Sequence, residues 1–145
     1  MRQIIIVRKD LKMSPGKLRA QVAHASMAFF THMLKMADKA KWNHKYRMVL
    51  NLDEDLYDEW MCGIFIKTIC EAKNAYQLLK CVKIAEDLGL QEGVDFFLIK
   101  DACLTELKPE ETDEKGQGRV LTCIGFRPLP DDIAHKISKK YQLYR

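Results

Sequence analysis

The sequence lacks the paired cysteines and the long apolar runs that mark secreted and membrane proteins. Its five cysteines are odd in number and irregularly spaced, and no C-x-x-C pair occurs, so we expect reduced thiols in a cytoplasmic protein and no zinc site. The longest uncharged stretch, residues 20–34, contains two histidines and is too short and too polar to span a bilayer. The apolar run at residues 4–7 predicts a strand and is too short for a signal-peptide core.

The common motifs of cofactor-dependent and hydrolytic enzymes are also missing. The chain has no Walker loop, G-x-G-x-x-G, G-x-S-x-G or H-E-x-x-H sequence, no internal repeat and no low-complexity tract. Any chemistry must therefore be carried by residues that are separated along the chain.

The composition indicates one globular domain that covers residues 1–145. Apolar residues make up 48% of the 145 residues and charged residues 30%, which is an ordinary balance for a folded soluble domain. A chain of this size buries enough surface to fold without disulfides or metals.

The net charge of +4 is unevenly distributed, because the first 47 residues contain eleven Lys or Arg and only two acids, Asp10 and Asp38. A basic segment of this kind is typical of proteins that bind a polyanion such as nucleic acid. A charged, solvated surface without a partner is the alternative from charge alone.

Strands and helices are expected to alternate along the chain. Ser14-Pro15 is a helix start, and Gly89 is a helix stop. We predict strands at 3–8, 63–70, 94–100 and 119–126, and helices at 15–41, 53–60, 74–88 and 130–141, with 45–50 as a possible further helical segment and 105–118 as an acidic loop. This order favours an α/β domain of three layers, in which a four-stranded mixed sheet has helices on both faces.

Two groups of polar residues stand out from this background. Lys17, Gln21 and His24 fall within about 60° of one another on the first helix and form a polar stripe beside its apolar face. Asp101 ends a predicted strand, where α/β sheets place their sites, and Thr105 follows four residues later. Taken singly, these residues are also compatible with a surface lysine, a half-buried histidine and a turn aspartate.

These groups occur in segments that closely resemble the type 2 peptidyl-tRNA hydrolases. The resemblance covers nearly the whole chain and rests on residues 7–13, residues 16–25, Asp101-Ala102-x-x-Thr105, Ile124-Gly125, Pro128-x-Pro130 and Leu143-Tyr144. It implies a homodimer that cleaves the ester between a peptide and its tRNA without a cofactor or a metal.

The chemistry of ester hydrolysis leads to a hypothesis for the role of each of these residues. Lys17, Asp101, Thr105 and His24 are expected to be catalytic: Asp101 would orient or deprotonate water, Lys17 would stabilise the oxyanion, and Thr105 would donate to the ester. The role of His24 stays open: it either orients its neighbours or transfers a proton. The expected substrate-binding residues are Gln21, Arg8, Lys12 and Arg19, of which the three basic ones would contact tRNA phosphates.

Several positions differ from the family pattern. Cys103 stands where the family has glycine, Val120 stands where it has a second threonine, and Thr122 lies two residues further on. Residues 42–59 and the acidic loop 106–118 are longer than usual, and one stretch, residues 122–128, resembles the divergent peptidyl-tRNA hydrolase domain-containing branch. The alternative prediction is therefore a catalytically weak member that binds RNA or protein.

Overall fold

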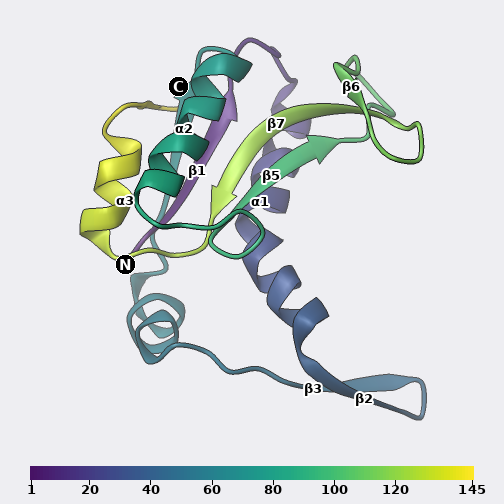
Figure 1. Ribbon diagram of the computed structural model, residues 1–145, viewed down its shortest axis with the longest axis vertical. Coiled ribbons are helices and arrows are strands. Elements are labelled where there is room, and N and C mark those ends of the chain that lie inside the picture. The colour runs from purple at the N-terminus through teal and green to yellow at the C-terminus, as the bar shows by residue number, and fades with distance from the viewer.

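A mixed sheet forms the centre of the computed structural model, which describes residues 1–145 (Figure 1). The strands lie in the order β5-β7-β1-β4-β8, and the short strand β6 pairs with the first two residues of β7. Only β1 and β4 are parallel. The strands are β1 (Gln3–Arg8), β4 (Lys67–Ala72), β5 (Phe96–Asp101), β6 (Glu111–Thr112), β7 (Gly118–Phe126) and β8 (Gln142–Leu143).

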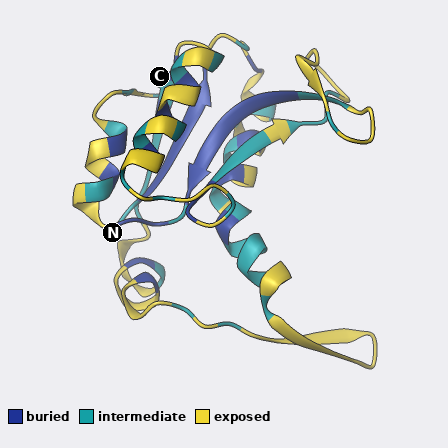
Figure 2. Cartoon of the chain, viewed as in Figure 1, coloured by how far each residue is buried: buried dark blue, intermediate teal, exposed yellow.

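Helices cover both faces of this sheet, which confirms the predicted three layers. The long helix α1 (Pro15–Met36) packs on β7, β5 and β1, whereas α2 (Ala75–Asp87) and α3 (Asp131–Ser138) lie on the opposite face (Figure 1). All six residues of β1 are buried, because a strand covered on both faces presents no side chain to water (Figure 2). None of the helices combines the length and apolar content needed to cross a membrane.

The predicted helix boundaries at Ser14, Asn74 and Gly89 are confirmed by local contacts. The Ser14 hydroxyl accepts from the Lys17 amide, and the Asn74 side chain accepts from the Gln77 amide. Gly89 follows α2 with a φ of 81°, the left-handed conformation that favours glycine after a helix.

The first helix is shorter than predicted, and the segment after it is a hairpin. α1 ends at Met36 and is followed by β2 (Asp38–Trp42) and β3 (Lys45–Val49), so the predicted helix over 37–41 and the possible helical segment at 45–50 are wrong. Asn43 and His44 both have positive φ, as a two-residue hairpin turn requires. The hairpin packs on no core, so the residues carry no apolar periodicity that would identify it.

The sheet has six strands, and the predicted four-strand count is wrong. The two additional strands, β6 and β8, are two residues long and exposed. Such short strands are defined by their pairing partners and carry little signal in the sequence. The short acidic helix predicted over 53–60 is the π-helix η1 (Leu56–Ile64), which buries Trp60 against Phe29.

The strand predicted from Gly63 starts only at Lys67. Phe65, which follows η1, has a φ of 60°, a left-handed conformation that interrupts an extended strand.

Helix α1 approaches the sheet most closely at Gly125 of β7. A Cβ at Gly125 would lie 2.3 Å from the carbonyl oxygen of Ala25, so the helix backbone occupies the space that a side chain would need. We expect Gly125→Ala to lower the free energy of unfolding by about 1–3 kcal/mol, because α1 must move outward. Urea denaturation measures this change.

The matched control for this variant is Gly16→Ala in the first turn of the same helix. A Cβ at Gly16 meets no atom within 4 Å. The control is expected to leave stability unchanged or to raise it, since alanine favours the helix more than glycine does. Equal stabilities for the two variants would contradict the close approach.

Candidate active site

The side chains of Lys17 and Asp101 form an ion pair at one end of the sheet. Lys17 lies in the first turn of α1 and Asp101 at the end of β5, and Lys17 Nζ is 2.7 Å from Asp101 Oδ1. Lys17 Nζ also donates to Thr105 Oγ1 at 3.2 Å. The side chains of the pair are only 14% and 10% exposed, so little bulk water screens their interaction.

Gln21, one turn after Lys17, is the second side chain that holds the carboxylate. Its amide nitrogen donates to Asp101 Oδ1 at 3.0 Å, while its amide oxygen accepts from the Thr122 hydroxyl at 2.6 Å. Thr122 lies on β7 and also contacts the carbonyl oxygen of Ile99 at 3.1 Å. Because an ionised carboxylate can only accept hydrogen bonds, the NH₂ group of Gln21 faces Asp101 and its amide oxygen faces Thr122.

The backbone after β5 completes the set of contacts to Asp101. The Cys103 amide donates to Asp101 Oδ2 at 2.9 Å, and Cys103 has a φ of 56°. This left-handed turn brings the amide back onto the carboxylate. A non-glycine residue in this region is uncommon, since its Cβ crowds the backbone.

These contacts keep Asp101 ionised at neutral pH. Burial acts to raise the pKa of Asp101, but the hydrogen bond and charge of Lys17, with the Cys103 amide and Gln21, outweigh it and hold the pKa below its ordinary value. The site thus contains one carboxylate, one ammonium group, an amide and hydroxyls. No group of three or more His, Cys, Asp or Glu residues is arranged to hold a metal ion.

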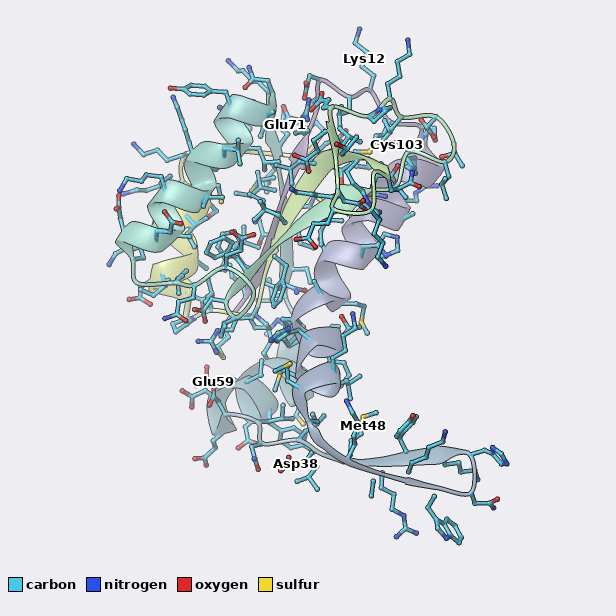
Figure 3. The ribbon with its side chains drawn as sticks, turned by 45° about the vertical axis from the view of Figure 1, so that its right-hand side comes forward. Lys12, Asp38, Met48, Glu59, Glu71 and Cys103 are labelled. Atoms are coloured by element: carbon cyan, nitrogen blue, oxygen red, sulfur yellow. The ribbon has the colours of Figure 1, made fainter.

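The other residues predicted for the site lie outside this network. His24 is exposed and lies one further turn along the same stripe of α1. Lys12 is exposed in the loop before α1, at the same end of the molecule as Cys103 (Figure 3). Arg19 is exposed about 200° around the helix from Lys17. There it borders an apolar pocket with Lys67 and Tyr144.

Arg8 is placed where it cannot contact a phosphate. Its side chain is 3% exposed, and its guanidinium donates to Asp10, to Glu110 and to the carbonyl oxygen of Leu121. Arg8 therefore holds the loop after β5 against the end of β1 and is not retained as a substrate-binding residue.

Most carboxylates of the acidic loop are bound within the protein. Glu106 accepts from the Ser14 amide and hydroxyl, and so caps the helix that carries Lys17. The other internal pairs are Arg8–Glu110, Lys100–Glu111 and Arg119–Asp113. The loop consequently presents much less free negative charge beside the site than its composition predicts.

A family model matches almost the whole chain: the model for peptidyl-tRNA hydrolase PTH2 covers residues 1–144. The chain belongs to the PTH2 family. This confirms the resemblance seen in the sequence, and peptidyl-tRNA hydrolysis is the enzyme activity of the family.

Full-length relatives agree with this assignment. The peptidyl-tRNA hydrolase of Methanopyrus kandleri is 30% identical over 144 residues, which are 99% of this chain and 98% of that protein. The Sulfolobus acidocaldarius protein of the same name is 28% identical over 143 residues and 99% of both chains. The sequence therefore matches the PTH2 family from end to end and not through one motif alone.

The contact that sequence reasoning missed in this PTH2 site is the one between Thr122 and Gln21. The sequence showed only that Thr122 lies on the same strand face as Val120, which is buried and pairs with Asp101 across the sheet. Pairing to Gln21 depends on how closely α1 packs on β7, and no local pattern reveals that distance.

The left-handed turn at Cys103 leads to a prediction about the residue type. We expect Cys103→Gly to keep hydrolase activity within about twofold and to leave stability unchanged or raise it by up to about 1 kcal/mol, because glycine adopts this φ without strain. Turnover and thermal melting measure both effects. A large loss of activity would mean that the Cys103 side chain itself has a role.

Proposed function

We propose that Lys17, Asp101 and Thr105 carry the hydrolysis of peptidyl-tRNA, with Gln21 as a positioning residue. The observation that supports this proposal is the partly buried carboxylate–ammonium pair, because each partner still has one unused hydrogen-bonding position. An ionised carboxylate accepts about four hydrogen bonds. Asp101 receives three, from Lys17, Gln21 and the Cys103 amide, and the position that remains lies on Oδ2.

The ammonium group of Lys17 also has one hydrogen-bond donor that is not used within the protein. Lys17 Nζ has three donor hydrogens and uses two of them, for Asp101 and Thr105. The Thr105 hydroxyl accepts from Lys17, so its own hydrogen is available to a substrate. The site thus offers one acceptor for a water molecule and two donors for an ester.

These positions match the needs of ester hydrolysis. Water held by Asp101 Oδ2 attacks the ester carbon, a new C–O bond forms, and the carbonyl oxygen takes up negative charge that Lys17 stabilises. The bond to the ribose oxygen then breaks, and the proton that water loses is transferred to that oxygen. With its pKa lowered, Asp101 is a weak base, so its main contribution is to orient the water.

Substitution of Thr105 tests the role of its hydroxyl. We expect Thr105→Val to lower kcat/KM for an N-acetylated aminoacyl-tRNA by about tenfold, since the ester then has one hydrogen-bond donor fewer. Thr105→Ser keeps the hydroxyl and is expected to stay within about threefold of the parent. Release of free tRNA is the measurement.

Two outcomes would reject the assignment. Equal losses in the valine and serine variants would show that the methyl group of Thr105 matters and the hydroxyl does not. A parent protein that releases tRNA no faster than buffer would favour the alternative of a binding module on a hydrolase fold.

We also propose that the protein is a cytoplasmic homodimer, as expected from the sequence. Met27, Ile64 and Phe65 are 50%, 85% and 49% exposed. Met27 and Phe65 border an apolar pocket that Phe30 also lines. Burial of this face in a second copy would remove it from water. Sedimentation of the parent and of Phe65→Asp is the test, and a parent that sediments as a monomer would reject the dimer.

A further inference from the structure

The hairpin formed by β2 and β3 stands apart from the rest of the molecule. It continues from the C-terminal end of α1 and projects away from the sheet (Figure 1), and each residue of its two strands is exposed (Figure 2). Its strands pair only with each other. A two-stranded hairpin without a supporting surface is marginally stable in water, so a partner is expected to stabilise it. We call residues 38–49 the arm.

Each face of the arm combines an aromatic ring with cations. The register pairs Trp42 with Lys45 and Ala40 with Arg47, so these residues share one face, and Arg47 lies 5.8 Å from the Trp42 ring. On the other face, Lys41 lies across from Tyr46, with its Nζ 5.9 Å from the ring. Trp42 and Tyr46 are 67% and 56% exposed. The arm has no apolar face that would cover a core.

The charge of the arm favours a polyanion. The arm contains four Lys or Arg residues and one acid, Asp38. Two copies of the arm would repel each other, and lysines on exposed strands oppose pairing with another sheet edge. Nucleic acid offers phosphates for the cations and bases or riboses for the rings, and single-strand-binding surfaces use this combination.

Helix α1, which connects the active site to the arm, carries no carboxylate. The sequence contains no Asp or Glu between Asp10 and Asp38, a range that includes all of α1. Lys17, His24, Thr31 and Lys35 fall within about 40° of one another on that helix, so one polar stripe runs from the catalytic lysine toward the arm. The arm starts roughly 30 Å from Lys17 along the helix. Figure 3 shows the arm residues Asp38 and Met48 at the opposite end of α1 from Cys103.

We propose that the arm binds the body of the tRNA substrate while its esterified end lies at Lys17 and Asp101. The inference rests on the proposed function, because that function places the ester at one end of α1. The stripe offers the RNA no carboxylate from α1 itself, and the arm adds affinity for the nucleic acid and takes no part in the reaction. His24 is exposed on this stripe, where it would contact the RNA.

The test compares one arm variant with a control on another surface of the protein. The arm variant is Trp42→Ala/Tyr46→Ala/Lys41→Gln/Arg47→Gln. The control is Tyr76→Ala/Lys80→Gln on α2, which removes another exposed ring–lysine pair, with Lys80 Nζ 4.6 Å from the ring. Binding is measured with uncharged tRNA over a range of salt concentrations. Turnover is measured with an N-acetylaminoacyl CCA trinucleotide, which is too short to reach the arm.

We expect the arm variant to bind tRNA about tenfold or more weakly, since it removes two cations and two aromatic rings from the contact with the RNA. The slope of log Kd against log salt should fall by about 0.7–0.9 for each phosphate that the variant no longer neutralises. Turnover of the trinucleotide should stay at the parent rate, and the control should match the parent in both assays.

Two results would overturn the proposal: unchanged tRNA affinity, or a loss of trinucleotide turnover in the arm variant. Unchanged affinity together with a change from dimer to monomer would assign the arm to contact with a second copy of the chain. If the parent binds tRNA through the arm but hydrolyses neither substrate, the proposed function fails and the arm proposal stands.

Discussion

Replacing Lys17 by methionine is expected to lower kcat for an N-acetylaminoacyl-tRNA by about 10²–10³-fold, the range found when one donor to a developing oxyanion is removed. Methionine keeps much of the side-chain length, so α1 should remain in place. Asp101 would then lose the partner whose Nζ lies 2.7 Å away and the charge that lowers its pKa. Single-turnover release of tRNA measures the change without the contribution of product release.

The companion variant Asp101→Asn separates the two halves of the pair. Its kcat is expected to fall by a similar factor, because an amide offers only one oxygen to the donors that now surround the carboxylate. Since both residues act on one water and one ester, Lys17→Met/Asp101→Asn should be little slower than either single variant. If the fold-loss in kcat of the double variant equals the product of the two single losses, the residues act independently.

A control for charge alone is Lys83→Met on α2. Lys83 forms an exposed pair with Asp87. Its removal takes away one positive charge at a distance from the site and should leave turnover unchanged. A loss comparable to that of Lys17→Met would indicate that net charge, and not the ion pair, governs the rate.

Replacing Arg8 by methionine is expected to lower the free energy of unfolding by about 3 kcal/mol, because removal of a nearly buried cation leaves its partners unpaired. The Arg8 guanidinium lies 2.8 Å from Asp10 and 2.7 Å from Glu110 and donates to the carbonyl oxygen of Leu121. Urea denaturation measures the loss. Lys83→Met is again the control, since an exposed pair contributes only about 0–1 kcal/mol.

The effect of Arg8→Met should depend on pH. The hydrogen bond from Arg8 lowers the pKa of Glu110, although burial opposes it. The stability that this pair contributes is present above the ordinary carboxylate pKa of about 4 and is lost as the pH falls through the lowered value. The difference between parent and variant should therefore shrink below about pH 4. A difference that stays constant there would mean that Arg8 stabilises through packing and its hydrogen bond to Leu121, and not through the carboxylates.

Much of the candidate active site was predictable from the sequence, because helical spacing and the ends of strands are local features. Ser14-Pro15 marks the start of α1, and helical periodicity then puts Lys17 and Gln21 on one stripe. A strand that ends in Asp101 points that carboxylate to an edge where α/β sheets place their sites. The structure confirms that these three residues meet.

Only the tertiary structure decided which charges are free and which are bound. A count of charges in the sequence does not tell a free charge from a paired one. In the structure, Arg8 pairs with Glu110 from the distant acidic loop, so neither charge is free. The same holds for Thr122, whose contact with Gln21 requires α1 to lie against β7 at Gly125. The arm was missed because it packs on nothing, and without a buried face its strands leave no periodic apolar pattern. Residue spacing predicts local geometry, whereas pairing between distant segments depends on the packing of the whole chain.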